Sequence, residues 1–202
     1  MANHYLVNQK GISPSDMIAK MVDEHFRISC FSSKDVLQCE EILMWSHYAN
    51  KHQGMRIKFS LNDMRTYPYY IKRIRYEKER IELDLASDKW GNSEALMDIC
   101  RMKAEGWHYE KEYRMFVSPR DCVHESDQDG VTRSFMPFAR EIIKGIDFGI
   151  RCPQLEMNKI VALCKKEYPG VELRKAVHHE SDFAIEYKNL QNPADCQIVT
   201  GI

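Results

Sequence analysis

The chain has 202 residues, of which 44% are hydrophobic and 29% charged, and its formal net charge is −1. This composition is typical of a globular protein with a substantial core, and the small net charge excludes a strong overall attraction to nucleic acid or anionic membranes. The net charge does not exclude a local basic patch at Lys72, Arg73 and Arg75. No apolar run approaches the ~20 residues of a membrane span and no secretory leader is recognisable, so we expect a cytoplasmic protein without membrane contact.

The first half of the chain is predicted to mix helices and strands. Ser13 suits the N-cap of a helix over residues 13–24, because Pro14 then occupies the first turn. Hydrophobic spacing predicts four more elements: a strand at 26–31, a helix at 40–50, and strands at 55–61 and 69–77.

The second half is predicted to be richer in strands. The elements expected there are a helix at 93–104, a strand at 106–116, an exposed loop at 122–130, strands at 132–139 and 141–149, a helix at 152–170, and strands at 171–179 and 182–190. Strands outnumber helices without alternating strictly with them, which favours the α+β class, with mostly antiparallel twisted sheets flanked by helices. We expect a single domain over 1–202 with loose termini at about 1–12 and 189–202.

The stretch "GWHYEKEYRMF" at 106–116 holds two closely spaced glutamates. On a strand, Glu110, Glu112 and Arg114 point to one face, and the two glutamate Cβ atoms lie only about 7 Å apart, so their ionisation is coupled. One interpretation is a solvated edge strand on which Arg114 compensates the carboxylates. The other is the wall of a cleft, where both carboxylates stabilise a cation-like transition state and activate a nucleophile.

A second group of candidate residues lies between the strand at 26–31 and Gly54. Ser32 follows the strand end, where a hydroxyl is well placed to bind a ligand. The next helix carries His47 and Tyr48, and Tyr48 offers a flat face for a planar ring. The alternative is that the aromatic residues of this helix belong to the core.

Metal and phosphate motifs are weak. The seven cysteines show no CxxC spacing, so we expect reduced cysteines and no metal. His178 and His179 lie near Asp182, but adjacent strand residues face opposite sides. The Glu-x-Lys fragment at 186–188 is similar to one in metal-dependent nucleases, and the nine glycines form no phosphate-binding loop.

Three motifs in order, "ISCFS", "LMWSHYANKHQGMRIKF" and "GWHYEKEYRMF", resemble a large bacterial family known as a domain of unknown function, DUF2971. The resemblance covers about residues 26–117, and the family label implies no established activity.

The same order of strand serine, helix tyrosine and Glu-x-Glu strand is distantly similar to the ADP-ribosyltransferase superfamily, which includes the DarT-type toxins. The resemblance implies an ADP-ribosyltransferase-like fold. It implies that Ser32 braces the nicotinamide-ribose pocket, that Tyr48 stacks on nicotinamide, and that Glu112 holds a ribose hydroxyl, while Glu110 activates the acceptor. His47 and Arg114 are expected to contribute to binding NAD, which would be the substrate.

The transferase plan begins with a strand whose His or Arg grips NAD, and here only residues 1–30 precede Phe31. His4 and Tyr5 are the candidates for a remnant of that strand. We therefore hold three hypotheses. The first is an ADP-ribosyltransferase-like protein that binds or consumes NAD, as a toxin or phage-defence effector with a protein or nucleic-acid acceptor. The second is a non-catalytic binding or assembly module with a partner protein or a second copy. The third is a metal-dependent nuclease.

Overall fold

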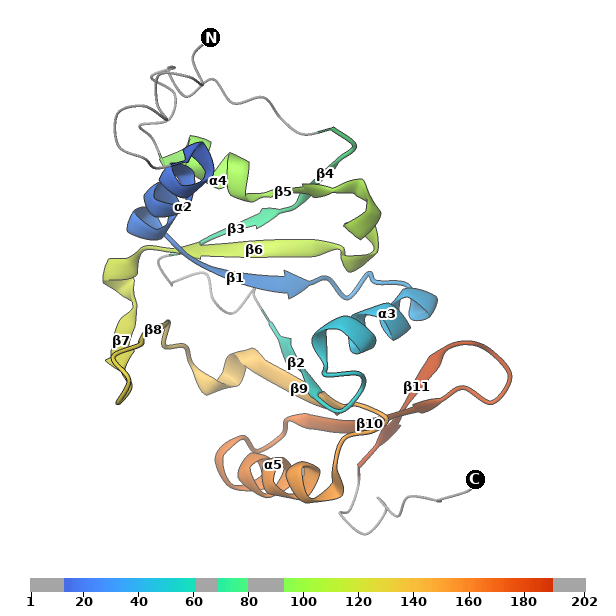
Figure 1. Cartoon of the computed structure of the whole chain (residues 1–202). Coiled ribbons are helices and arrows are strands. Elements are labelled where there is room, and N and C mark those ends of the chain that lie inside the picture. The colour runs from blue at the N-terminus through green and yellow to red at the C-terminus, as the bar shows by residue number, and fades with distance from the viewer. Residues whose placement is uncertain (1–12, 61–68, 80–92, 191–202) are drawn as a thin grey trace. The chain divides into compact units, whose positions relative to one another are not determined.

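The computed structural model describes residues 13–60, 69–79 and 93–190 (Figure 1). Of the loose ends predicted at about 1–12 and 189–202, residues 1–12, with the candidates His4 and Tyr5, and 191–202 lie outside these residues, whereas Asn189 is the last residue of a strand. The described residues form helices and several small sheets with mostly antiparallel pairing, which confirms the α+β class. None of the helices in the described ranges is long and apolar enough to cross a membrane.

Internal contacts divide the chain into two compact units, and each is described by itself. Unit 1 comprises Met1–Asp35 and Pro68–Pro137, and unit 2 comprises Val36–Tyr67 and Phe138–Ile202. The expectation of a single domain over 1–202 stays a prediction.

Unit 1 is built on a three-stranded antiparallel sheet in the order β1-β6-β3. Its strands are β1 (Arg27–Ser32), β6 (Glu112–Val117) and β3 (Tyr69–Arg73). Helices α2 (Pro14–His25) and α4 (Ser93–Cys100) contribute apolar residues to a cluster with the sheet: Phe26, Leu96, Met97 and Phe116, bordered by Met21 and Val22. The central strand β6 is therefore anchored at Phe116, which is fully buried.

The helix start predicted at Ser13 is confirmed. Its side chain accepts a hydrogen bond from the Asp16 amide, 3.1 Å away, and Pro14 occupies the first turn of α2. This capping satisfies one of the amide groups that a helix leaves unpaired at its N-terminus.

The strand predicted at 69–77 is in fact two strands in different sheets. After β3 the chain passes through buried Ile74 into β4 (Arg75–Glu77), which pairs in parallel with β5 (Met102–Ala104). The break arises because the Ile74 amide still bonds to Glu112 O, whereas the Arg75 amide bonds to Arg101 O. The helix predicted to run to residue 104 accordingly ends at Cys100.

The predicted loop at 122–130 is largely an exposed hairpin. Strand β7 (Val123–Ser126) pairs antiparallel with β8 (Thr132–Phe135), and Gly130 in the turn has a φ of 78°. A positive φ favours glycine, which is why the turn ends there.

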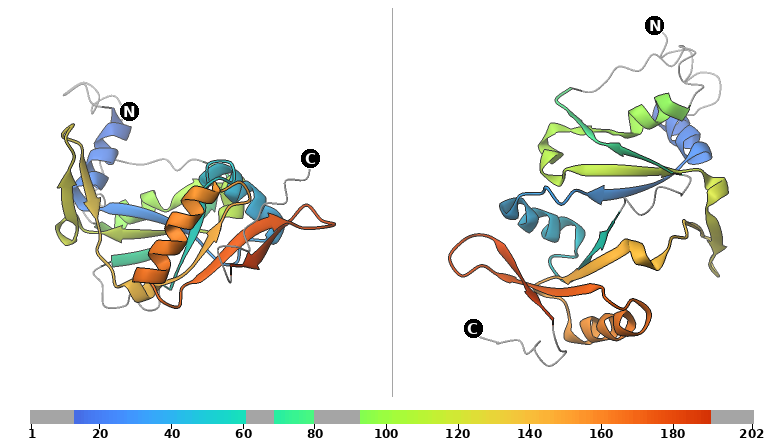
Figure 2. Two further views of the ribbon diagram at one scale, coloured as in Figure 1. Left: turned by 90° about the horizontal axis from the view of Figure 1, so that it is seen from below. Right: turned by 180° about the vertical axis from the view of Figure 1, so that it is seen from behind.

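Unit 2 contains a four-stranded sheet in the order β11-β10-β9-β2. Its strands are β2 (Met55–Phe59), β9 (Ile143–Phe148), β10 (Glu172–His178) and β11 (Ile185–Asn189). Only β9 and β10 are parallel, because helix α5 (Gln154–Glu167) connects them as a crossover (Figures 1 and 2). Two short 3₁₀ turns are η4 (Pro119–Asp121) in unit 1 and η5 (Arg140–Ile142) in unit 2.

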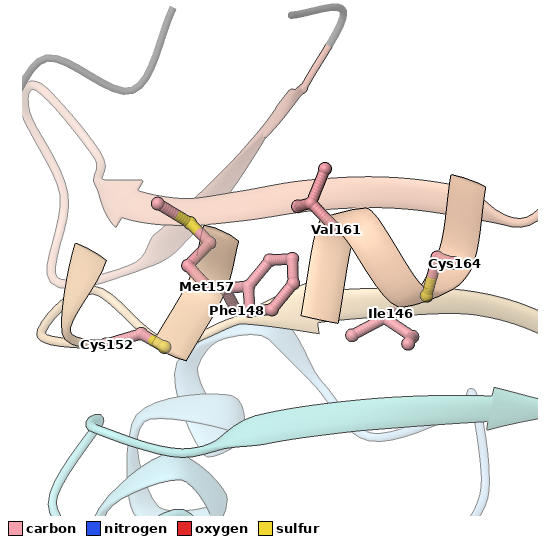
Figure 3. Close-up of a cluster of buried hydrophobic side chains, with 6 residues drawn as sticks. All are labelled: Ile146, Phe148, Cys152, Met157, Val161 and Cys164. Atoms are coloured by element: carbon pink, nitrogen blue, oxygen red, sulfur yellow. The ribbon is translucent and has the colours of Figure 1, made fainter. Parts of the chain in front are cut away.

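The core of unit 2 has two parts. Figure 3 shows the first, where α5 packs on β9 through Ile146, Phe148, Cys152, Met157, Val161 and Cys164. In the second, helix α3 (Gln38–Tyr48) packs on β10 and β11 through Trp45, Ala49, Ala176 and Ile185. Gly149 is required after β9, because a Cβ there would lie 2.2 Å from His52 O.

Candidate functional site

The predicted glutamate strand is only half a strand. Residues Glu105–Glu110 form a 3₁₀ turn, η3, and β6 begins at Glu112. Between them, Lys111 has a left-handed backbone with a φ of 47°. Glu110 and Glu112 therefore do not share a face by strand alternation, and the prediction on that point is wrong.

Lys103 nevertheless brings the two carboxylates together. Its ammonium group, which projects from β5, hydrogen-bonds to Glu110 Oε2 and lies 2.9 Å from Glu112 Oε2. Only 2% of Glu110 and 3% of Glu112 is exposed. The interpretation as a solvated edge strand is therefore wrong, since β6 is the central strand of its sheet and both glutamates are buried.

Arg114 provides a second cation to this group. Its Nε donates to Glu112 Oε1 at 2.7 Å, and its Nη1 donates to the carbonyl of Cys100. A buried carboxylate is costly unless it is paired, and Glu112 is paired from both sides. The compensation by Arg114 that the sequence indicated is thus present, but in a buried setting.

The environment of Glu112 keeps it ionised. Burial alone would raise the pKa of its carboxyl group, but hydrogen bonds from Arg114, Lys103 and Cys30 lower this pKa to about 2. Burial likewise opposes the charge of Lys103, yet its bonds to Glu110 and Glu112 raise its pKa well above the usual value. Both groups thus carry their charges throughout the neutral range.

Ser32 is a neighbour of Glu112 in the same sheet. It is the last residue of β1 and pairs directly with Glu112 on β6, and its side chain is exposed. One residue further on, the Ser33 amide bonds to Lys111 O at 3.1 Å. The sheet therefore brings three predicted site residues of unit 1 into one place: Ser32, Glu112 and Arg114.

Two residues of this site were not predicted as functional. The Tyr76 hydroxyl accepts a hydrogen bond from the Glu112 amide at 2.9 Å, and Lys103 binds both carboxylates. The sequence places Lys103 inside a predicted helix, so no spacing rule linked it to the glutamates. Tyr76 was assigned to one long strand, and that assignment does not predict its contact with the Glu112 amide.

Tyr48 and His47 lie on α3 in unit 2. Tyr48 is 60% exposed, and its ring lies 6.3 Å from that of His47. Trp45, in contrast, is buried and donates to the Tyr187 hydroxyl at 2.9 Å, so it is a core residue. That Tyr48 and His47 act together with Glu112 stays a prediction.

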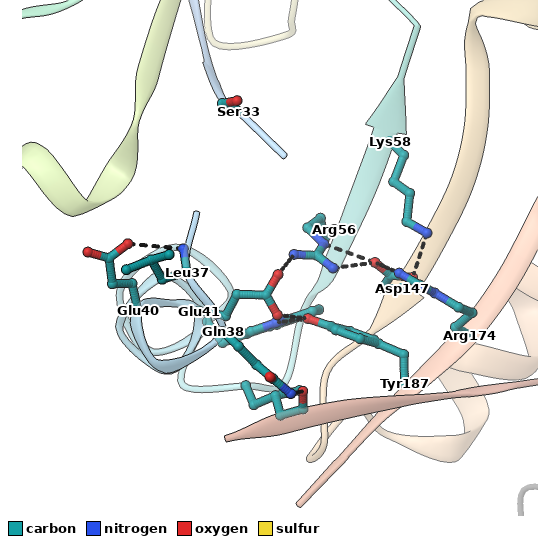
Figure 4. Close-up of polar contacts among 12 residues, drawn as sticks. Ser33, Leu37, Gln38, Glu40, Glu41, Arg56, Lys58, Asp147, Arg174 and Tyr187 are labelled. Atoms are coloured by element: carbon teal, nitrogen blue, oxygen red, sulfur yellow. Dashed lines mark hydrogen bonds and ion pairs between the residues drawn. The ribbon is translucent and has the colours of Figure 1, made fainter. Parts of the chain in front are cut away.

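Unit 2 also contains a buried polar cluster that the sequence did not reveal (Figure 4). Asp147 is fully buried and binds Arg174 and Arg56, each at 2.7 Å. Both guanidinium groups also lie over the Tyr187 ring, and Glu41 accepts from the Tyr187 hydroxyl at 2.6 Å. Beside this cluster is an open pocket of about 450 Å³.

The histidine pair and the Glu-x-Lys fragment are not part of any metal-binding arrangement in the described residues. Across residues 13–60, 69–79 and 93–190, no group of three or more His, Cys, Asp or Glu side chains is placed to hold a metal ion. His179 contacts Glu186 at 3.3 Å, and Tyr187 of the Glu-x-Lys fragment belongs to the Asp147 cluster.

Comparison with known proteins gives one result. Residues 44–115 match the model of a family described as protein of unknown function (DUF2971). This match supports the resemblance to that family and includes the second half of α3 and most of β6. No curated protein and no solved structure matches the chain.

Proposed function

We propose that this protein is ADP-ribosyltransferase-like and binds and consumes NAD, with a role as a toxin or phage-defence effector on a protein or nucleic-acid acceptor. The observation that carries the proposal is the position of Glu112. It is a buried, ionised carboxylate paired across the sheet with the exposed Ser32 at a strand end.

The chemistry uses that permanent charge. When the bond between nicotinamide and ribose C1′ breaks, its electron pair leaves with nicotinamide and the ribose becomes oxocarbenium-like. Ionised Glu112 accepts a ribose hydroxyl bond and stabilises the positive charge. The acceptor, or water, attacks C1′ and passes its proton to Glu110.

The test is incubation of the purified protein with NAD, followed by chromatography for released nicotinamide. Release by the wild type and its loss in Glu112→Gln are expected, whereas Glu105→Gln, at an exposed glutamate of the nearby turn η3, should retain the activity. Thermal melting checks that both variants fold. No release by the wild type would refute the catalytic proposal.

The second candidate is a non-catalytic binding or assembly module. The observation in its favour is that Lys103 and Arg114 already occupy the carboxylates of Glu110 and Glu112. A module of this kind predicts no NAD turnover and a stable complex with a partner. Co-purification of the tagged chain with the products of neighbouring genes tests it, and Glu112→Gln should leave that complex intact.

A further inference from the structure

Phe183 is an aromatic residue at the tip of the hairpin that joins β10 to β11. The tip projects from the sheet of unit 2 (Figures 1 and 2), and 97% of Phe183 is accessible to solvent. Burial of a phenylalanine side chain stabilises a protein by about 1.5–3 kcal/mol, and Phe183 contributes almost none of this to its own fold. Its role is therefore to be sought outside the core.

Hydrogen bonds within the tip hold its backbone in one conformation. The His179 amide donates to Ala184 O at 3.1 Å, and the Ala184 amide donates to Asp182 O at 2.8 Å. The ring of His179 accepts, through Nδ1, hydrogen bonds from the amides of Ser181 and Asp182 at 3.3 and 3.1 Å. A loop that is ordered in advance loses little conformational entropy on binding, so Phe183 is well presented to a partner.

The tip is acidic. Glu180, Asp182 and Glu186 lie within three residues of Phe183, and residues 176–187 contain no Lys or Arg. The side chains of Asp182 and Glu186 are 72% and 43% exposed, and Glu180 is exposed as well. Carboxylates around the aromatic ring repel the phosphates of nucleic acids and anionic lipids, and they attract the basic groups of a protein.

The open pocket of about 450 Å³ adjoins the same hairpin. Its lining includes Ile185 and Glu186 of β11 and the apolar Val36. Arg174 also lines the pocket, but its guanidinium group is bound to Asp147. A basic side chain that enters the pocket therefore meets the partly exposed carboxylate of Glu186, and the pocket extends the acidic surface of the tip.

We propose that the β10–β11 hairpin is the docking surface for a basic partner protein. In this complex Phe183 fills an apolar hollow of the partner, and the carboxylates around it pair with Lys and Arg side chains at the rim of that hollow. Aromatic side chains that fill such hollows commonly carry a large share of the binding free energy. A second copy is disfavoured as the occupant, because two acidic tips repel each other. The docking does not depend on the reaction at Glu112.

The first measurement is photo-crosslinking of the full chain in its native cells. The photoreactive p-benzoylphenylalanine replaces Phe183 or, as a matched control, Leu155, an exposed apolar residue on α5 of the same unit. Mass spectrometry identifies the captured protein and its cross-linked residues. We expect position 183, and not position 155, to capture a protein at apolar residues that are bordered by Lys and Arg.

The second measurement is titration of the full chain with that purified protein by calorimetry. Phe183→Ala should weaken the affinity ~30-fold or more, the loss expected for a dominant interface residue, whereas Leu155→Ala should leave the affinity unchanged. Thermal melting checks that both variants fold. Glu180→Gln combined with Asp182→Asn should slow association and reduce its dependence on salt, because the charges at the rim steer the encounter.

Several results would overturn the docking proposal. They are cross-links from position 183 to lipid, to a second copy or to no molecule, and an undiminished affinity of the captured protein for Phe183→Ala. Docking and catalysis also fail separately, since Glu112→Gln should leave the complex intact. Nicotinamide release without docking overturns the docking proposal alone, and docking without release contradicts the catalytic proposal alone.

Discussion

Replacement of Lys103 by methionine tests how the glutamate pair is held. The substitution retains the length of the side chain and removes the charge that Glu110 and Glu112 share. Loss of one partner from a buried ion pair costs about 3–5 kcal/mol, because the remaining charge stays buried. We expect about 3 kcal/mol, the lower end, since Glu112 retains Arg114 at 2.7 Å and the Lys103 side chain is itself 20% exposed.

This loss should depend on pH. The folded-state pKa of Glu112, about 2, lies below its ordinary value of 4.5, so its contribution to stability is complete above pH 4.5 and disappears as the pH falls towards 2. Without the hydrogen bond from Lys103 the pKa of Glu112 rises, and protonation of its carboxylate then relieves part of the lost pairing. The difference in the free energy of unfolding between wild type and variant should therefore be largest at pH 7 and smaller at pH 4.

The assay is urea denaturation at both pH values. Lys78→Met is the matched control, because the Lys78 side chain is 78% exposed and its ion pair with Glu105 is long, at 3.9 Å. This substitution should change the free energy of unfolding by no more than about 0.5 kcal/mol. The double variant Lys103→Met with Glu110→Gln should regain part of the loss. A loss below about 1 kcal/mol, or an equal loss at pH 7 and pH 4, would refute the account.

Three further substitutions test other contacts. Asp147→Asn should cost about 3 kcal/mol in urea denaturation at pH 7, because two partly exposed arginines lose the charge of their shared, fully buried carboxylate, and a neutral result would contradict the role of that cluster. Ser13→Ala should lower the free energy of unfolding by about 1 kcal/mol through loss of the N-cap of α2, and an unchanged midpoint would show that the cap contributes nothing. Burial and Glu112 raise the pKa of the Cys30 thiol, so Glu112→Gln should speed its alkylation by iodoacetamide at pH 8, as followed by mass spectrometry, whereas a slower reaction would contradict this cause.

Elements with local signals could be predicted from the sequence. The cap at Ser13 and the existence of helix α5 follow from signals in neighbouring residues, and both were found, although α5 spans Gln154–Glu167 and not 152–170. The strands at 171–179 and 182–190 were likewise predicted from the residue pattern within each segment, and β10 and β11 form an antiparallel pair there.

The misassigned stretches depend on partners that are distant in sequence. Residues 69–77 alternate as one strand, but hydrogen bonds to Glu112 and then to Arg101 divide them between two sheets. The turn at Lys111 is held by its carbonyl, which accepts a hydrogen bond from the amide of Ser33, just after β1. No periodicity within residues 106–116 contains that information, so the glutamates were placed on one face by an alternation that the backbone does not follow.

The charge state of Glu112 limits what the site can do. A general acid works best when its pKa lies near the operating pH, whereas the cations around Glu112 hold its pKa at about 2. Glu112 therefore donates no proton at neutral pH and acts instead as a fixed negative charge. Such a charge favours a reaction in which positive charge develops on the ligand, as at the ribose of NAD, and it equally favours the binding of a ligand that brings hydroxyl donors. In both proposed functions Glu112 is ionised. They differ in whether a ligand displaces Lys103 and Arg114 from the Glu112 carboxylate, and the Lys103→Met variant removes one of these two partners.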